Sequence, residues 1–247
     1  MSVSEMKILV TGASSGIGAH ITRFLAKEGA TVVAAARREA QLAALAEDCA
    51  GAVIPLAMDV GDPASVETGV AKAAEQMGGL DGLFNNAGIA WGGRAMEMSE
   101  DDWSRVIDIN VNGVFRAAKA AAHVMARDGG GAILNTASIL GFGTGSGSAA
   151  YATSKAAVVH ATRCLALEWA RHDIRVNAIA PGYFLTEMTD PFLSSEHGKD
   201  LAKDVPMRRI GNLHELEGPV ELLLGSKGTF ITGATLAVDG GHLCRSL

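Results

Sequence analysis

Thr11-Gly12-Ala13-Ser14-Ser15-Gly16-Ile17-Gly18 follows an apolar run at residues 7–11 and leads into an Ala-containing segment that begins near residue 16. Glycine has no Cβ, so Gly12, Gly16 and Gly18 let the backbone turn sharply and let another group approach it closely. The free N–H groups at a helix N-terminus bind phosphate. The order strand, glycine loop, helix therefore predicts a site for the pyrophosphate of a dinucleotide, although a turn that merely needs glycine gives the same pattern.

Outward from this stretch, short apolar runs alternate with longer Ala-rich segments, which is typical of parallel βαβ units. Because the apolar runs are continuous rather than alternating, both faces of the sheet are expected to be covered. We predict an α/β fold, a doubly wound (Rossmann) parallel seven-stranded sheet with helices on both faces. Strands are expected at 7–11, 31–36, 52–58, 82–84, 132–137, 175–180 and 235–238, and helices near 16–28, 38–49, 63–77, 100–127, 149–172 and 213–225.

The domain organisation follows from what the chain lacks and from its one irregular stretch. No Pro/Ser-rich linker and no internal repeat divide the sequence, so residues 1–247 are predicted to form a single dinucleotide-binding and catalytic domain. Near residues 183–207, Pro, Ser and Gly interrupt the regular pattern. Such a stretch is typical of a functional loop, and we expect a substrate lid there.

Composition and charge exclude several classes of protein. The chain has 27 Asp and Glu against 21 Lys and Arg, a net charge of −6, which argues against nucleic acid or an anionic membrane as a partner. The first seven residues carry no apolar signal region, and no stretch approaches the ~18 apolar residues of a membrane span, so a cytoplasmic protein is expected. Three widely separated cysteines indicate free thiols, with no metal site.

The end of the second predicted strand bears on the choice of cofactor. A fold that binds NAD usually has an acidic residue there, about 20 residues after the glycines, to accept a bond from the ribose 2′-hydroxyl. This chain has Ala36, followed by Arg37 and Arg38. A guanidinium offers forked donors to a 2′-phosphate, so NADP(H) is favoured. NAD(H) remains possible if the two arginines merely open the next helix.

The chain resembles the short-chain dehydrogenase/reductase family over nearly its whole length, in a simple form like the 3-oxoacyl reductases. The resemblance rests on the glycine motif, on Asn85-Asn86-Ala87-Gly88, on Ser138, and on Tyr151 with Lys155 as YxxxK. It implies a catalytic set of Asn110, Ser138, Tyr151 and Lys155. It also implies cofactor contacts from Gly12, Ser14, Ser15, Gly16, Ile17, Gly18, Arg37, Arg38, Asp59, Val60, Asn86, Ala87, Gly88, Tyr151, Lys155, Pro181, Gly182, Phe184 and Thr186. Within that set, Asp59-Val60 would contact adenine and Thr186 the nicotinamide carboxamide.

The spacing of Tyr151 and Lys155 indicates acid/base chemistry without the family name. Residues four apart lie on one face of a helix. An isolated Tyr titrates near 10, so it is a poor base at neutral pH until a neighbouring cation favours its phenolate. Ser138, after a strand, is placed to bind the substrate oxygen together with Tyr151. The resemblance implies that Asn110 holds a water in a proton relay. The alternative for Asn110, and for Asn86, is a structural role in which the side chain bonds backbone groups.

Loop residues and two helices indicate the remaining partners. Leu140 and Tyr183 lie beyond predicted strand ends and are expected to contact a small carbonyl or alcohol substrate together with Ser138 and Tyr151. The helices around residues 113–125 and 156–170 are apolar on nearly every side, which predicts burial against the sheet and against a second subunit. The resemblance likewise implies a homodimer or homotetramer.

The leading hypothesis is an NADP(H)-dependent oxidoreductase that interconverts a ketone or aldehyde and a secondary alcohol, with Tyr151 as the acid/base. One alternative is an NAD-linked alcohol dehydrogenase of the same fold, in which Arg37 takes no part. Another is a non-catalytic protein that senses a dinucleotide, but the intact set of Ser138, Tyr151 and Lys155 argues against it. The sequence does not indicate which carbonyl compound is the substrate.

Overall fold

A computed structural model describes residues 2–193 and 201–244. Its centre is one seven-stranded sheet in the order β3-β2-β1-β4-β5-β6-β7, in which every neighbouring pair is parallel. The strands are β1 (Lys7–Thr11), β2 (Thr31–Ala36), β3 (Val53–Ala57), β4 (Gly82–Asn85), β5 (Gly131–Thr136), β6 (Ile174–Pro181) and β7 (Thr235–Val238). The predicted fold class is confirmed.

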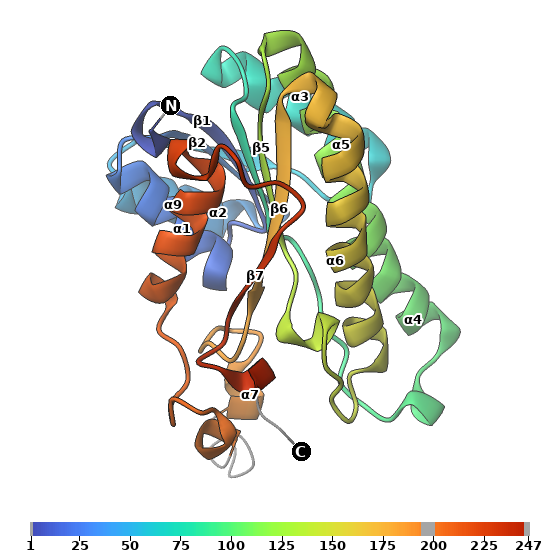
Figure 1. The fold of residues 1–247 in the computed structure, drawn as a ribbon. Helices are drawn as coiled ribbons and strands as arrows, with labels where there is room; N and C mark the ends of the chain where they lie inside the picture. The colour runs from blue at the N-terminus through green and yellow to red at the C-terminus, as the bar shows by residue number, and fades with distance from the viewer. Residues whose placement is uncertain (1, 194–200, 245–247) are drawn as a thin grey trace.

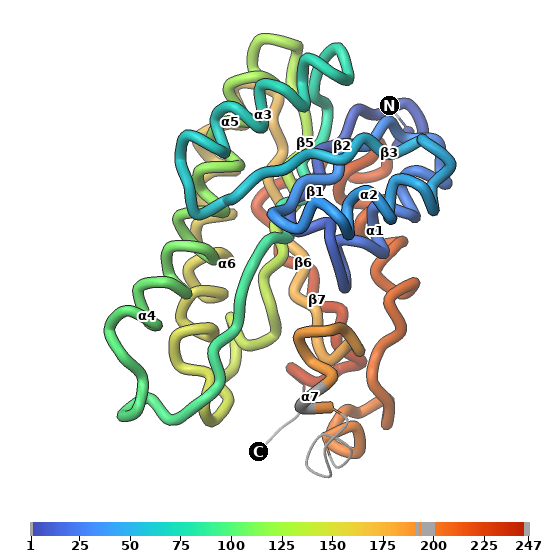
Figure 2. Tube along the Cα trace, turned by 180° about the vertical axis from the view of Figure 1, so that it is seen from behind, coloured from blue at the N-terminus to red at the C-terminus, as the bar shows by residue number. Residues whose placement is uncertain are grey.

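Helices cover both faces of the sheet, as Figures 1 and 2 show. They are α1 (Gly16–Lys27), α2 (Glu39–Asp48), α3 (Pro63–Met77), α4 (Glu100–Ile107), α5 (Gly113–Asp128), α6 (Ala149–Trp169), α7 (Asp190–Leu193) and α9 (Glu217–Leu224). Successive strand residues point to opposite faces. Ile8 and Val10 therefore pack with residues of α1, α2 and α9, whereas Leu9 packs with residues of α3 and α5. Two hydrophobic layers result, one on each side of the sheet.

Local sequence chemistry explains the bounds of α3, which agree with the prediction. The Asp62 carboxylate accepts a hydrogen bond from the backbone N–H of Ala64 at 3.0 Å and so caps the first turn. Pro63 takes the first helical position, where no N–H is needed. Gly78 ends the helix in the left-handed conformation, at φ 68°.

The predicted continuous helix over residues 100–127 is wrong in its middle. Between α4 and α5 the chain makes a π-helical turn at Asp108–Asn112. Single π turns are frequent where a helix must present a particular side chain. Here the turn holds Asn110, which is fully buried, and its amide binds the backbone of the segment after β4. The predicted helices at 149–172 and 213–225 also contain 3-10 turns, at Ala170–His172 and Leu213–Leu216.

The predicted lid at residues 183–207 is only partly within the described chain, since residues 194–200 lie outside it. In its first part, Phe184 forms a parallel bridge with Gly211, and the Thr189 hydroxyl donates to the Phe184 carbonyl at 2.5 Å. Both the single domain and the lid function stay predictions. No helix in the described part of the chain is long and apolar enough to span a membrane.

Candidate active site

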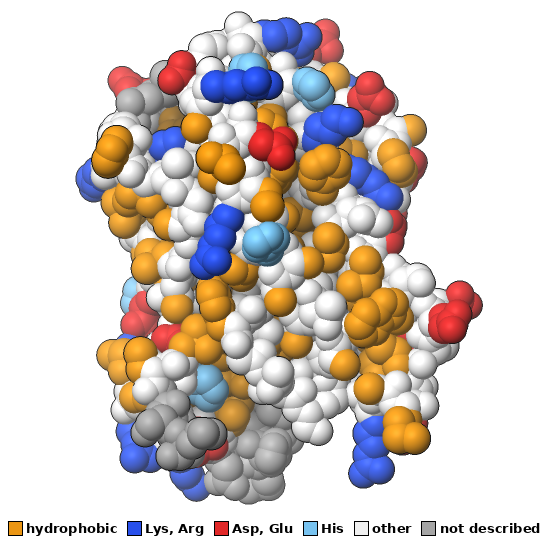
Figure 3. All heavy atoms as spheres, turned by 45° about the vertical axis from the view of Figure 1, so that its right-hand side comes forward, with side chains coloured by type: hydrophobic (Ala, Val, Ile, Leu, Met, Phe, Trp, Pro, Cys, Tyr) orange, Lys and Arg blue, Asp and Glu red, His pale blue; other side chains and the backbone are white. Residues whose placement is uncertain are grey.

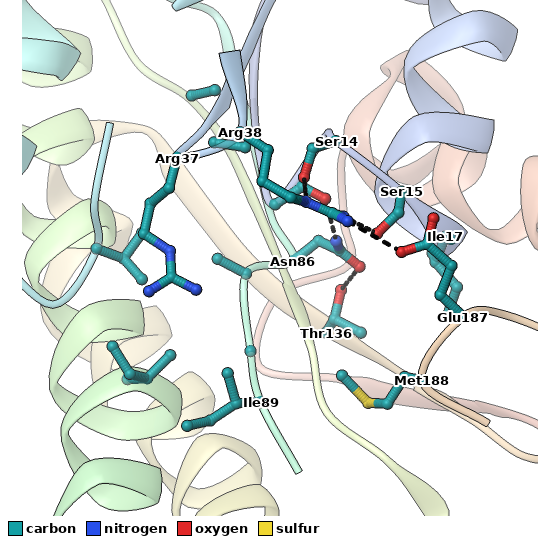
Figure 4. Close-up of a pocket in the computed structure, with 18 of the residues that line it drawn as sticks. Ser14, Ser15, Ile17, Arg37, Arg38, Asn86, Ile89, Thr136, Glu187 and Met188 are labelled. Carbon is teal, nitrogen blue, oxygen red and sulfur yellow. Dashed lines mark hydrogen bonds and ion pairs between the residues drawn. The ribbon is translucent and has the colours of Figure 1, made fainter. Parts of the chain in front are cut away.

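A cleft of about 440 Å³ opens at the carboxyl ends of the strands, where β1 lies between β2 and β4. This is the point at which the strand order reverses, the usual ligand position in such a sheet. Figure 4 shows its lining. Of the residues that the sequence singles out, the cleft brings together Gly12, Ser14, Ser15, Gly16, Ile17, Arg37, Arg38, Asp59, Val60, Asn86, Ala87, Gly88, Tyr151, Lys155 and Thr186.

The other predicted residues do not line this cleft. They are Gly18, Asn110, Ser138, Leu140, Pro181, Gly182, Tyr183 and Phe184. Tyr183 and Phe184 line a second cavity, of about 500 Å³, next to residues 205–211 and the end of β7. Phe184 is buried because its ring lies over Gly211. Gly182 packs against Asp239.

The glycine loop is a cradle that larger residues would fill. Gly12 and Gly16 have φ of +67° and +54°, in the left-handed region that favours glycine. A Cβ on Gly12 would lie 2.8 Å from the Ala87 Cα, and one on Gly18 would meet the Gly12 carbonyl. Because α1 begins at Gly16, its first N–H groups face this loop. The cradle fits a dinucleotide pyrophosphate.

Asn86 ties three strand ends together at this cradle. Its Nδ2 donates to the carbonyls of Thr11 at 3.3 Å and of Gly12 at 3.4 Å, and its Oδ1 accepts from the Thr136 hydroxyl at 3.4 Å. The side chain therefore has the backbone-bonding role that the sequence left open. It fixes the glycine loop relative to β5.

Lys155 is the buried cation of the site, with 3% of its surface exposed. Its Nζ donates to the Thr136 carbonyl at 2.8 Å and lies 5.5 Å from the centre of the Tyr151 ring. Burial disfavours the charged form and lowers the pKa of Lys155 to about 8. The ammonium is therefore still the main form at neutral pH, beside the tyrosine ring.

Ser138 does not line the cleft itself, but it forms a hydrogen bond with Tyr151, which does. Burial raises the pKa of Tyr151, and a side-chain hydrogen bond with Ser138 partly offsets that effect. The Ser138 hydroxyl also accepts a hydrogen bond from the backbone N–H of Leu140 at 3.2 Å. With the phenol kept protonated, two adjacent hydroxyl groups, one in the cleft and one beside it, are able to donate to one oxygen atom.

Asn110 binds the segment after β4 and the helix α6. Its Oδ1 accepts from the Ile89 N–H at 2.8 Å, and its Nδ2 donates to the Ile89 carbonyl at 2.8 Å and to the Ser154 hydroxyl at 3.0 Å. Both amide hydrogens are thus used, and only acceptor capacity on Oδ1 remains. The contacts are those of a residue that positions the segment after β4, whereas the water-holding role stays a prediction.

The two arginines after β2 differ in their contacts. Arg37 reaches into the cleft without a hydrogen bond or ion pair to the described residues, as Figure 4 shows. Arg38 instead binds Ser14, Ser15 and Glu187. At the neighbouring Asp59, Oδ1 accepts from the Gly61 N–H at 2.9 Å.

Among the cleft residues that the sequence analysis does not name are Ile89, Thr136 and Glu187. Ile89 directly follows Gly88, and Thr136 ends β5, so their nearness to strand ends was a usable signal. The acidic side chain of Glu187 next to Thr186 was a weaker signal.

Comparisons with known proteins find relatives over almost the whole chain. A family model described as enoyl-(acyl carrier protein) reductase matches residues 12–242. A 3-oxoacyl-[acyl-carrier-protein] reductase of Thermotoga maritima is 36% identical over 236 residues, which are 94% of this chain and 96% of that protein.

Two solved structures have nearly the same fold. A short-chain type dehydrogenase/reductase from Mycobacterium marinum is 36% identical with a TM-score of 0.93, over 99% of this chain and 98% of that one. A gluconate 5-dehydrogenase from Burkholderia cenocepacia J2315, in complex with NADP and tartrate, is 34% identical with a TM-score of 0.92, over 97% and 95% of the two chains.

The lowered pKa of Lys155 predicts a pH dependence of stability. Between pH 8 and 10 the folded protein has released the Lys155 proton, whereas the unfolded chain still holds it. This group should therefore increase the free energy of unfolding as pH rises. The gain is about 2 kcal/mol over that interval. Urea unfolding of wild type and Lys155→Met at several pH values should show a difference that grows by this amount. Parallel pH profiles for the two proteins would contradict it.

Proposed function

The chain belongs to the short-chain dehydrogenase/reductase family, whose members are NAD(P)-dependent oxidoreductases of CH–OH and C=O groups, and we propose how this member works. It interconverts a ketone or aldehyde and a secondary alcohol, with NADP(H) as the preferred cofactor and Tyr151 as the acid/base. The observation that carries this proposal is one cleft lined by the glycine cradle, by both arginines and by the Tyr151 and Lys155 pair.

The chemistry divides between the cofactor and the side chains. A bound nicotinamide dinucleotide supplies or accepts the hydride. The hydroxyls of Ser138 and Tyr151 hold the substrate oxygen, on which negative charge develops in the reducing direction. Tyr151 donates its proton to that oxygen, and burial keeps this proton in place beforehand by raising the pKa of Tyr151. The Lys155 ammonium, 5.5 Å from the tyrosine ring, stabilises the phenolate that remains.

Support for NADP(H) comes from the absence of a carboxylate at Ala36 and from two guanidinium groups beside it. Both Arg37 and Arg38 line the cleft. Arg37 has no other partner among the described residues, so it is available to a 2′-phosphate without loss of an existing contact. The related gluconate 5-dehydrogenase was solved with NADP. A cytoplasmic location belongs to the same proposal.

Loss of the Tyr151 hydroxyl gives the most direct test. Tyr151→Phe should lower kcat at least about a hundredfold and leave cofactor affinity nearly unchanged, because general acid/base catalysis supplies about 10² to 10⁴ in rate. The chain has one other tyrosine, Tyr183, in the second cavity. Tyr183→Phe is the matched control and should leave kcat nearly unchanged, because Tyr183 does not line the cleft. Near-normal kcat in Tyr151→Phe, measured with a panel of ketones and NADPH, would end the assignment.

Arginine substitution tests the choice of cofactor. A charge-assisted contact is worth about 1.5 to 3 kcal/mol, so Arg37→Ala should raise the KM for NADPH about ten- to a hundredfold and leave that for NADH nearly unchanged. Ala36→Asp should shift preference toward NADH, since the carboxylate accepts from the 2′-hydroxyl and repels a phosphate. A wild type that prefers NADH in kcat/KM, with no effect of Arg37→Ala, would favour the NAD-linked alternative.

We also propose that α4, α5 and α6 meet a second copy of the chain. Trp103, Phe115 and Leu167 on these helices are 40%, 47% and 83% exposed. Figure 3 shows apolar side chains scattered among charged and histidine side chains on this face. The outward sides of the helices are thus more mixed than the sequence suggested, because α5 also exposes Lys119 and His123.

Sedimentation tests this assembly. At micromolar concentration the protein should sediment as a homodimer or homotetramer, and Leu167→Arg should shift it toward smaller species because a charge in an apolar contact is costly to desolvate. A 25.4 kDa monomer across a dilution series would contradict the proposal.

A further inference from the structure

Arg38 joins the two sides of the cleft mouth. Its Nε donates to the Ser14 hydroxyl at 3.1 Å, its Nη2 to the Ser15 hydroxyl, and its Nη1 to the Glu187 carboxylate at 3.1 Å. The serines belong to the glycine loop, and Glu187 belongs to the segment that follows β6. Figure 4 shows all three contacts around one guanidinium group.

These contacts use three of the five N–H groups of the guanidinium group and leave one on Nη1 and one on Nη2. A phosphate that accepts from these two N–H groups would share Nη1 with the Glu187 carboxylate, so two anions would compete for the charge of one guanidinium group. A serine hydroxyl both donates and accepts, so Ser14 and Ser15 are able to accept from Arg38 and donate to a phosphate at the same time. A carboxylate only accepts and carries a negative charge. Glu187 is therefore the one partner of Arg38 that opposes a bound phosphate.

We propose that Glu187 is a cofactor-specificity residue, because its carboxylate competes with the 2′-phosphate of NADP(H) for Arg38. NAD(H) has no 2′-phosphate, so its binding leaves the Arg38–Glu187 pair in place. The proposal rests on the proposed use of NADP(H). In it, the Glu187 carboxylate weakens the binding of NADP(H) and leaves the binding of NAD(H) unchanged through this contact.

The expected effect of Glu187 on the affinity for NADPH is modest. The Arg38 and Glu187 side chains are 44% and 67% exposed, and ion pairs of this kind are weakened by solvent. Removal of the Glu187 charge should therefore strengthen NADPH binding by about two- to fivefold. Repulsion between Glu187 and the remainder of the dinucleotide acts on both cofactors, so it cancels in the ratio of their dissociation constants.

The experiment measures the dissociation constants of NADPH and NADH by nicotinamide fluorescence at low salt. Glu187→Gln should lower the NADPH constant two- to fivefold and change the NADH constant by less than about 1.5-fold. Glu187→Ala, which also removes the acceptor atoms, should have at least as large an effect. In an Arg38→Ala background, Glu187→Gln should no longer change the ratio of the two constants.

Glu39→Gln provides the matched control. Glu39 directly follows Arg38 and is exposed, but no hydrogen bond or ion pair joins it to Arg38 among the described residues. It should leave the ratio of the constants unchanged. The inference is overturned if Glu187→Gln shifts both cofactors equally or neither, if Glu39→Gln has the same selective effect, or if the effect persists without Arg38.

The outcomes separate this inference from the proposed function. A wild type that prefers NADPH, with no selective effect of Glu187→Gln, overturns the role of Glu187 and leaves the proposed function intact. A wild type that prefers NADH, but gains NADPH affinity in Glu187→Gln only when Arg38 is present, supports the role of Glu187 and contradicts the proposed cofactor preference.

Discussion

The Thr11 hydroxyl joins the two strands between which the cleft opens. Its Oγ1 accepts hydrogen bonds from the backbone N–H groups of Asn86 at 3.0 Å and Ala87 at 3.1 Å, and it donates to Asn85 Oδ1 at 3.3 Å. Thr11 is fully buried, so no water can replace these contacts, and unpaired N–H groups there would be costly. One oxygen atom thus fixes the segment after β4 against the segment after β1, and the position of the glycine cradle depends on it.

The same buried polar chain continues toward the acid/base residues. Asn85 Nδ2 donates to Asn135 Oδ1 at 3.2 Å, and Asn135 Nδ2 donates to the Thr162 hydroxyl of α6 at 3.0 Å. The helix that carries Tyr151 and Lys155 is therefore linked to β5, β4 and β1 by side chains as well as by packing. A buried network that is fully paired favours one arrangement of its elements over others. The cofactor end and the acid/base end of the cleft are held at a fixed separation by the core of the sheet.

The parts of the fold that the sequence predicted are those with a local cause. The bounds of α3 follow from Asp62, Pro63 and Gly78, which all act within one turn of the helix ends. The π turn at Asp108–Asn112 escaped prediction because Asn110 binds Ile89, 21 residues away. In the site, the glycine loop and the Tyr151 and Lys155 spacing are local patterns, whereas the contact between Arg38 and Glu187 spans 149 residues. Phe184, expected at the cofactor, is instead buried over Gly211, a contact that only the folded chain creates.

Burial shifts the two acid/base groups in opposite directions, and this gives the site a preferred resting state. It raises the pKa of Tyr151 and lowers that of Lys155 to about 8, so at neutral pH the phenol is protonated and the lysine is mostly charged. That state is ready to donate a proton, as reduction of a carbonyl requires. In the reverse direction Tyr151 must lose its proton where burial opposes the phenolate, and the Lys155 cation is the neighbouring side chain that offsets this cost. Because Lys155 itself loses its charge above about pH 8, the help that it gives to the phenolate declines as the solution becomes more basic.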